Sequence, residues 1–347
     1  MRRNLLIWMM ILFTIPLLTQ AQGGLPPANP GGSTGEIRIA GISSLVPLTN
    51  MIATSYRDDG FGGTISVGME APDSAFARFC AGELDIVLSG QQPSPVDFDN
   101  CEAAGRSFLS FRVATDAVTV ATSPNNSFID SLTTAELQQV FGNALSWSSV
   151  RADWPGDPIG RFGPATTSSD FNLFAALVFG GDSRALSTAL GAQYLEDANL
   201  ALQYVQASPT AIGFFDADFA DRNAAMLKLI PIGGVLPSTQ NITELVYPLA
   251  RPLFLFTATS VIQTQPQVAD FINYYLTISP LEIQSTDLYG VPQNARDAAA
   301  ANWFEAIGSA PPVQQVTEAP PTEETEVAPP VDVTEEPTPE ATPAAVS

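Results

Sequence analysis

The sequence predicts an α/β protein with two α/β halves, two extended crossings that join them, and a cleft between the halves. The first observation is an alternation of strand and helix patterns over residues 36–89, which is typical of a parallel sheet flanked by helices. The second is a similar series over residues 158–232. The third is a pair of apolar β segments near 112–118 and 245–255, which we expect to connect the halves.

The first half contains three strand patterns and two helix patterns. Glu36-Ile-Arg-Ile-Ala-Gly41 alternates around β-branched residues, as a half-buried strand does. Ser43 and Ser44 then precede an apolar helix pattern, where their hydroxyls suit a helix start. The remaining elements are expected at residues 64–68 (strand), 73–81 (helix, with Ala75, Phe76 and Phe79 on one face) and 84–89 (strand).

The second half begins after a long β segment over residues 111–122. Thr133 and Glu136 then form a capping box, which predicts a helix that ends at Phe141. The other elements of this half are expected at residues 158–163 (strand), 170–179 (helix), 211–215 and 228–232 (strands). The chain then returns through an apolar β segment at residues 247–256 and closes with an amphipathic helix at 265–276.

The amino terminus predicts export. Arg2 and Arg3 precede an apolar run over residues 5–18, and cleavage is expected after Ala21, which is the pattern of a secretory signal peptide over residues 1–21. The alternative is an uncleaved membrane anchor, which the short run disfavours because a spanning helix needs about 20 residues. We therefore expect an extracytoplasmic protein, secreted or held in the periplasm or at the cell surface.

Composition sets the expected domain bounds. Residues 22–35 are rich in Pro and Gly and predict a linker, while residues 309–347 are rich in Pro, Thr and Glu. We expect this tail to be disordered because it can bury too little apolar surface to offset its ordering entropy. Between them we expect lobe I (36–114 and 250–308) and lobe II (115–249). The chain passes from lobe I to lobe II at the first crossing and returns at the second.

The charge and residue inventory excludes several function classes. The 14 basic and 36 acidic side chains give a net charge of −22, which argues against nucleic acid as a partner and favours solubility. The chain has no His and one Lys, Lys228, so Ser-His-Asp units and His-containing zinc sites are excluded, and no GxxxxGK[ST] loop is present. We expect a monomer that is not an enzyme and needs no metal or cofactor.

The two cysteines, Cys80 and Cys101, allow a single intrachain pairing. An exported protein meets an oxidising environment, which favours that disulfide. In the chain-entropy model, closing a loop of about 20 residues stabilises the fold by roughly 3 kcal/mol.

In open α/β sheets, ligands sit at the carboxyl ends of strands and often on helix N-termini. The candidate site therefore consists of four loops, at residues 41–45, 69–75, 89–92 and 166–171.

Five segments in this order resemble the substrate-binding proteins of phosphate-specific ABC transporters, which are type II periplasmic-binding proteins. The likeness spans Glu36 to Pro292. The segments are Ile39-Ala-Gly-Ile-Ser-Ser-Leu-Val-Pro-Leu-Thr49, Phe79-Cys-Ala-Gly-Glu-Leu-Asp-Ile86, Leu132-Thr-Thr-Ala-Glu-Leu137 with Val140-Phe141, Ala211-Ile-Gly-Phe-Phe215, and Tyr247-Pro-Leu-Ala-Arg-Pro-Leu-Phe254. The resemblance implies a bilobal type II fold that captures phosphate, or a related oxyanion, and delivers it to a membrane ABC permease.

The family grips phosphate with helix N-terminal amides, hydroxyls and a basic side chain, and the resemblance transfers these roles position by position. The family's Gly-Ser-Ser-Thr loop becomes Gly41-Ile42-Ser43-Ser44, and its Ser-Arg becomes Ser89-Gly90. Its glycine-rich loop becomes Met69 to Ser74, where Pro72 removes a backbone donor. The ligand-binding residues implied in this way are Ser43, Ser44, Leu45, Asp73, Ser74, Ser89, Gly90, Ser168, Ser169 and Asp170.

These departures leave two functional hypotheses. Gly90 removes a cation, and Asp170 stands where the family has the Thr of Ser-Gly-Thr, so a carboxylate would repel the anion. Monohydrogen phosphate still carries a proton, so a single carboxylate, either Asp73 or Asp170, could accept a hydrogen bond from it. Arg78 and Arg161 are the nearest basic residues in sequence, and each could instead pair with a surface carboxylate. The alternative to phosphate capture is a diverged paralogue that binds another ligand or serves as an extracellular sensor or scaffold.

The serines of the candidate loops also have a purely structural reading. Ser43, Ser44, Ser168 and Ser169 all precede or begin a predicted helix, where hydroxyls cap the chain with or without a ligand. Their predicted convergence on one cleft favours the functional reading.

Overall fold

The computed structural model describes residues 24–309. The strands are β1 (Glu36–Gly41), β2 (Thr64–Met69), β3 (Ile86–Ser89), β4 (Phe108–Thr122), β5 (Gly160–Pro164), β6 (Ala192–Leu195), β7 (Ala211–Asp216), β8 (Lys228–Leu229) and β9 (Ala250–Ala258). The α-helices are α1 (Val46–Asp58), α2 (Pro72–Cys80), α3 (Pro95–Ala103), α4 (Thr134–Phe141), α5 (Ser169–Phe179), α6 (Ser183–Ser187), α7 (Ala198–Ala207), α8 (Ala217–Arg222), α9 (Thr239–Thr243), α10 (Thr259–Thr264), α11 (Pro266–Glu282) and α12 (Gln293–Ala306). Short 3₁₀ turns are η1 (Pro30–Gly32), η2 (Ser43–Leu45), η3 (Trp147–Ser149) and η4 (Ile283–Ser285).

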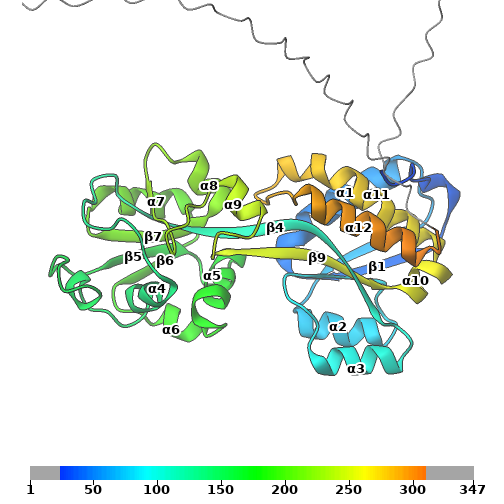
Figure 1. The fold of residues 1–347 in the computed structure, drawn as a ribbon, viewed down its shortest axis with the longest axis horizontal. Helices are drawn as coiled ribbons and strands as arrows, with labels where there is room; N and C mark the ends of the chain where they lie inside the picture. Colours follow the sequence, from blue (N-terminus) through cyan, green and yellow to red (C-terminus); the bar gives the residue numbers. More distant parts are fainter. Residues whose placement is uncertain (1–23, 310–347) are drawn as a thin grey trace, which may run out of the picture. The chain divides into compact units, whose positions relative to one another are not determined.

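The strands form one sheet in the order β2-β1-β3-β9-β4-β7-β5-β6, with β8 paired to β4. The β1, β2 and β3 strands are parallel, as are β5, β6 and β7, whereas β4 and β9 are antiparallel to each other and to their neighbours. Figure 1 shows β4 and β9 running side by side from one α/β half to the other. The bilobal α/β fold is therefore confirmed, and these two strands are its crossings.

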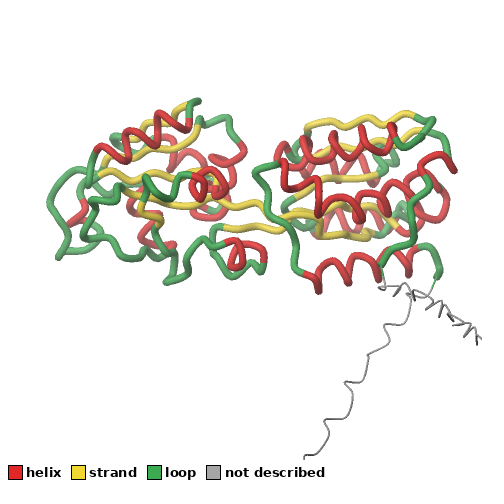
Figure 2. Tube along the Cα trace, turned by 90° about the horizontal axis from the view of Figure 1, so that it is seen from above, coloured by secondary structure: helices red, strands yellow, loops and turns green. Residues whose placement is uncertain are grey.

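The buried side chains separate into cores that follow the two halves. One cluster draws on residues 37–114 and 253–306, and the other two on residues 117–249. We keep the lobe bounds 36–114, 250–308 and 115–249 as a proposal, which this division of the cores supports. Figure 2 shows helices flanking the strands in each half.

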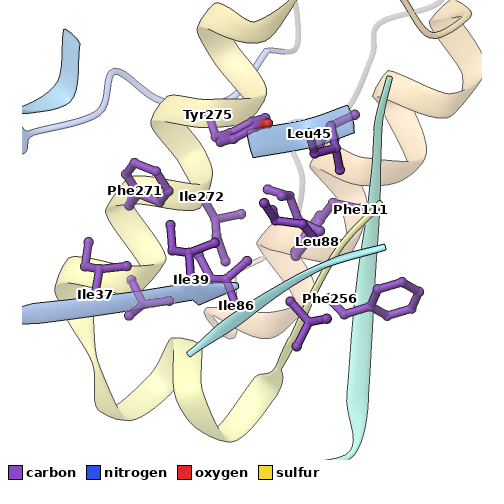
Figure 3. Packing of buried hydrophobic residues seen from close by; sticks show 14 of the residues in the cluster. Ile37, Ile39, Leu45, Ile86, Leu88, Phe111, Phe256, Phe271, Ile272 and Tyr275 are labelled. Carbon is purple, nitrogen blue, oxygen red and sulfur yellow. The ribbon is translucent and has the colours of Figure 1, made fainter. Parts of the chain in front are cut away.

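The first core illustrates how the pattern of β1 produces packing. Ile37 and Ile39 alternate on one face of β1 and meet Ile86 and Leu88 of β3 beneath Phe271 of α11 (Figure 3). All five are at most 2% exposed. Burial of one such side chain contributes about 1.5 to 3 kcal/mol, so this face fixes which side of the sheet α11 covers.

The predicted elements are present with small differences in their bounds. The capping box is confirmed, because Thr133 Oγ1 accepts from Glu136 N at 3.2 Å while the Glu136 carboxylate accepts from Thr133 N at 2.8 Å. The disulfide between Cys80 and Cys101 is also confirmed, and it ties α2 to α3. The strand expected over residues 228–232 is restricted to the two residues of β8.

The amino-terminal part of the predicted linker is held against α11. Asn29 N donates to Asp270 Oδ1 at 2.8 Å, and Asn273 Nδ2 donates to the Pro26 carbonyl at 3.0 Å. The Pro- and Gly-rich composition alone predicts a free linker, but the extended chain finds polar partners on this helix. The predicted signal peptide and all but the first residue of the predicted tail lie outside the described residues. Within residues 24–309, no helix is both long and apolar enough to cross a membrane.

Candidate anion site

The three lobe I loops of the candidate site lie together at the carboxyl ends of β1, β2 and β3. Glu70 N donates to the Gly41 carbonyl at 2.8 Å, and Ile42 N donates to the Leu88 carbonyl at 3.0 Å. A Cβ at Gly41 would overlap the Leu88 carbonyl, so glycine is required where β1 turns into η2. This close approach places the hydroxyls of η2 beside the loop that follows β3.

The first loop presents Ser43 and Ser44 on η2. Ser43 is exposed and Ser44 is half-buried, whereas the Leu45 side chain is fully buried in the core. The Leu45 amide donates to the Ile42 carbonyl at 3.3 Å. The side chain with a long-range partner is Ser44, whose Oγ accepts from Arg251 Nη2 at 3.1 Å.

The polar side chains of the second loop bond to one another and to the third loop. Ser74 Oγ donates to Glu70, and Asp73 Oδ1 accepts from Gln91 Nε2 at 3.1 Å. Arg78 bonds to Glu70 and Glu83, each at 2.9 Å. The hydroxyl of Ser74, followed by Arg78, lowers the pKa of Glu70. Arg78 is therefore a partner of surface carboxylates.

The third loop is closed by Ser89. This residue is fully buried, and its Oγ donates to the Gln91 carbonyl at 2.8 Å while accepting from Gln91 N at 3.0 Å. Its hydroxyl thus shapes the turn in which Gly90 lies. A Cβ added at Gly90 would lie 3.0 Å from Arg251 Cδ and 3.1 Å from Arg251 Nε.

Arg251 of β9 brings a cation to these loops. Its Nη2 donates to Asp116 Oδ2 at 2.8 Å, and its Nε donates to the same oxygen at 3.3 Å. The two residues are paired in the β4–β9 register. The Arg251 side chain is 20% exposed, whereas that of Asp116 is 5% exposed. The departure at Gly90 therefore does not leave the lobe I loops without a positive charge.

The fourth loop begins α5. Ser168 is its N-cap, because its Oγ accepts from Phe171 N at 3.0 Å. Ser169 Oγ donates to Asp170 Oδ1 at 3.2 Å. Burial, followed by the negative charge of Asp116, raises the pKa of Asp170 to about 6, while Ser169 and Arg251 oppose this rise. Asp170 thus shares its electrostatic surroundings with the Asp116–Arg251 pair.

Arg161, the other basic residue considered from the sequence, lies inside lobe II. It is 1% exposed and donates to the carbonyls of Val140, Ala144 and Ile159, the last at 3.2 Å. Burial lowers its pKa. Neither alternative given for Arg161 holds, since this guanidinium bonds to main-chain carbonyls rather than to a ligand loop or a surface carboxylate.

Further carboxylates gather beside the crossings. Oxygens of Asp216, Asp218 and Asp287 lie within 4.8 Å of one another. Arg222 pairs with two of them, at 3.0 Å from Asp218 and 3.3 Å from Asp287. Burial, more than the nearby charges of Asp170 and Asp287, raises the pKa of Asp216 to about 8. Because Arg222 already pairs with this group, we assign it as an ion-pair network.

Ser44 of the first loop thus bonds to Arg251, and Gly90 of the third loop leaves room for its side chain. The charges of Arg251 and Asp116 act on the pKa of Asp170 in the fourth loop. Ser43, Asp73 and Ser74 lie on the same loops without a bond to Arg251 among the described residues. Sequence reasoning missed Arg251 and Asp116. The available signal was a basic residue inside the otherwise apolar segment Tyr247-Pro-Leu-Ala-Arg-Pro-Leu-Phe254.

Comparisons with known proteins agree with this fold. The chain is 27% identical over 297 residues to Protein SphX of Synechococcus elongatus, covering 82% of this chain and 86% of that protein. It is 26% identical over 267 residues to the phosphate-binding protein PstS of Staphylococcus saprophyticus, covering 75% and 82% respectively.

Solved structures show the same architecture. The crystal structure of a possible phosphate binding protein from Planctomyces limnophilus matches with a TM-score of 0.71 at 27% identity, covering 79% of this chain and 99% of that one. PstS from Borrelia burgdorferi shares the fold with a TM-score of 0.63 at 13% identity, covering 75% and 100%. Residues 26–278 match the family described as PBP superfamily domain. This protein therefore belongs to the PBP superfamily.

Proposed function

We propose that this protein is an extracytoplasmic solute-binding protein that captures phosphate for an ABC importer. The relatives named above support the ligand, since PstS is named as a phosphate-binding protein. The observation that carries the proposal is the Arg251 guanidinium, which bonds to Ser44 and lies against Gly90 at the carboxyl ends of the lobe I strands. A cation beside hydroxyls is what an oxyanion requires.

The proposed ligand-binding residues are those of the four loops, with Arg251 added. Ser44 and Arg251 would donate to the anion from lobe I and its crossing, and the α5 N-terminus would contribute from lobe II. Ser89 would act by shaping the loop, because its hydroxyl is bonded to Gln91. Leu45 would act through the main chain, because its side chain is buried.

The protein would work as a monomer and would not catalyse a reaction. It would close around phosphate by rotation at β4 and β9 and then dock on a membrane permease. The acidic surface makes nucleic acid an unsuitable partner.

Calorimetric titration tests this function. The protein is unfolded and refolded to remove bound ligand, and its fold is verified before phosphate is added at pH 7 and pH 5.5. We expect micromolar or tighter binding. If folded protein gives no heat up to millimolar phosphate at either pH, the proposed function is wrong and other ligands must be sought.

A further inference from the structure

We propose that the chain between η4 and α12 is a third crossing between the lobes, and that Tyr289 anchors it in lobe II. Residues 286–291 belong to lobe I at both ends, since η4 precedes them and α12 follows them. The crossing holds the lobes within a narrow range of orientations before a ligand arrives. Its effect on affinity rests on the phosphate-binding function proposed above, whereas the crossing itself does not.

Neighbouring side chains of this segment pack against different cores. Leu288 packs against the lobe I cluster, whereas Tyr289 packs against the lobe II cluster that contains Phe214 and Tyr247. Leu288 and Tyr289 are both half-buried. A chain that is covalently joined to lobe I therefore places one aromatic ring on the apolar core of lobe II. Lobe II can separate from the segment only by exposing that ring to water, which is unfavourable.

Main-chain hydrogen bonds join the same segment to β4. Thr115 N donates to the Tyr289 carbonyl and Tyr289 N donates to the Thr115 carbonyl, each at 2.8 Å, as in an antiparallel bridge. Thr115 Oγ1 also donates to the Gly290 carbonyl at 3.2 Å. The partner of Thr115 in the β4–β9 register is Pro252, which has no N–H to donate. At Thr115, β4 is therefore paired with this segment as well as with β9.

The bridge lies where β4 passes from one lobe to the other. Val113 and Ala114 pack in the lobe I core, and Ala117 packs in the lobe II core. The β4–β9 register shifts between Arg112 and Ala114, and a bulge of this kind bends a strand and interrupts its ladder. The bridge to Tyr289 thus supports the two covalent crossings beside their least regular point.

Polar side chains add two further links between the lobes. Arg112 Nη2 donates to Thr115 Oγ1 and to the carbonyl of Thr243, the last residue of α9, both at 2.7 Å. Arg222 of α8 pairs with Asp287 at 3.3 Å. The Arg222–Asp287 pair is exposed on both sides and contributes little because water and salt screen it. The buried contacts of Tyr289 are therefore the main attachment of the segment to lobe II.

The orientation of the lobes depends on these contacts at the crossings. Within residues 24–309, no hydrogen bond or salt bridge joins the lobe I loops of the candidate site to the start of α5. A third attachment restricts the twisting and bending of a ribbon of two strands. Ligand binding then has less motion to arrest, which reduces the entropic cost of closing around the ligand.

The test measures the distribution of distances between the lobes in the ligand-free protein. Spin labels are attached through Asn50→Cys on α1 and Gln139→Cys on α4, which are both exposed. The native cysteines are already joined to each other and do not react with the label. Pulsed electron paramagnetic resonance then gives the width of the distribution.

Three variants are compared in this labelled background. Tyr289→Ala removes the anchor, whereas Tyr289→Phe keeps the ring that packs on the lobe II core. Tyr204→Ala is the matched control, because Tyr204 of α7 stacks on Phe162 within lobe II at a centroid distance of 5.3 Å. The control loses a tyrosine ring from the same lobe without touching the crossings.

We expect Tyr289→Ala to widen the distance distribution about 1.5-fold, while Tyr289→Phe and Tyr204→Ala match the wild type. In calorimetric titration, Tyr289→Ala should bind phosphate with a Kd about fivefold higher than that of the wild type. If folded Tyr289→Ala has the same distribution as the wild type, the proposal is overturned. A widened distribution in Tyr289→Ala, with no phosphate heat from the folded wild type, supports the crossing and refutes the proposed function.

A second variant serves if Tyr289→Ala does not fold. Thr115→Val keeps the size of a buried side chain and removes the hydroxyl that bonds to Arg112 and to the Gly290 carbonyl. We expect it to widen the distribution to a smaller extent. An unchanged distribution in folded Thr115→Val would also overturn the proposal.

Discussion

Gly90 leaves room for the side chain of Arg251, although 161 positions separate the two residues in the sequence. A Cβ at Gly90 would lie 3.0 Å from Arg251 Cδ, 3.1 Å from Arg251 Nε and 3.2 Å from Leu253 Cδ2. A side chain at position 90 would therefore crowd the Arg251 side chain, whose guanidinium bonds to Ser44. The glycine at position 90 and the position of the Arg251 side chain therefore depend on each other.

Gly90→Ala should displace the Arg251 side chain and weaken phosphate binding. We expect about a tenfold increase in Kd, equivalent to about 1.4 kcal/mol, because the bond to Ser44 depends on the present position of the guanidinium. Titration calorimetry measures the effect. Gly290→Ala is a matched control, since a Cβ there meets nothing within 4 Å. Equal affinities for the two variants would contradict the assigned role of the Gly90 contact.

Arg251→Gln should weaken phosphate binding by about a hundredfold or more, as expected when one charge of a close pair is removed. It should also destabilise the fold by about 3 kcal/mol, because Asp116 would be left buried without its partner. Calorimetry and chemical denaturation measure the two effects separately.

The double variant Arg251→Gln with Asp116→Asn separates the two roles of Arg251. Neutralising Asp116 removes the unpaired charge, so we expect stability to recover towards the wild type while binding remains weak. Wild-type affinity in the folded double variant would show that Arg251 does not serve the ligand.

Asp216→Asn should stabilise the protein increasingly as pH rises from 4 to 8. The folded-state pKa of about 8 lies above the ordinary value of 3.8, so the folded state binds this proton more tightly and stability decreases across that range. Asn keeps the bond from Phe219 N at 2.8 Å and cannot ionise. At pH 8 we expect a gain of at least about 1.4 kcal/mol, the value of one pKa unit.

Thermal denaturation at pH 4 and pH 8 measures this gain. At pH 4, close to the unfolded-state pKa of 3.8, the folded state holds the proton and the unfolded state still holds part of it, so the two proteins should differ much less than at pH 8. A gain that is the same at both pH values would exclude ionisation of Asp216 as its cause.

Replacing both Cys80 and Cys101 with Ala should lower the free energy of unfolding by about 3 kcal/mol, since the bridge spans 21 positions. Denaturation in urea measures the loss. Adding a reductant should destabilise the wild type towards the variant without changing the variant. An unchanged urea midpoint in the variant would mean that the bridge contributes nothing to stability.

Local patterns were sufficient to predict most of the fold. The alternation in β1 and the capping box at Thr133 each depend on residues within a few positions, and both are present. The helix α3 was missed although Ser94 and Asp97 form a capping box there, so the signal was available. For α12, the run of Ala residues before Asn302 gives no clear apolar periodicity, and packing against β4 determines the helix.

The site was harder to predict because its charges meet through pairing distant in sequence. Asp116 and Arg251 face each other only through the β4–β9 register, which no local pattern specifies. Comparison of position 90 with the family therefore indicated that the basic side chain of Ser-Arg is lost. It could not indicate that Arg251 brings a positive charge to the same loops. Arg161 failed as a candidate for a different reason: it is near the α5 loop in sequence, but its side chain is buried and bonds to main-chain carbonyls elsewhere in lobe II.

The position of Arg251 on β9 has a mechanical consequence for the proposed function. β4 and β9 are the strands that pass between the lobes. An anion held by Arg251 would therefore be attached to the hinge rather than to either moving lobe. Charge would then be recognised at the point that moves least, where Arg251 already bonds to Ser44. Affinity for charge and the extent of closure could accordingly be altered by separate sets of substitutions.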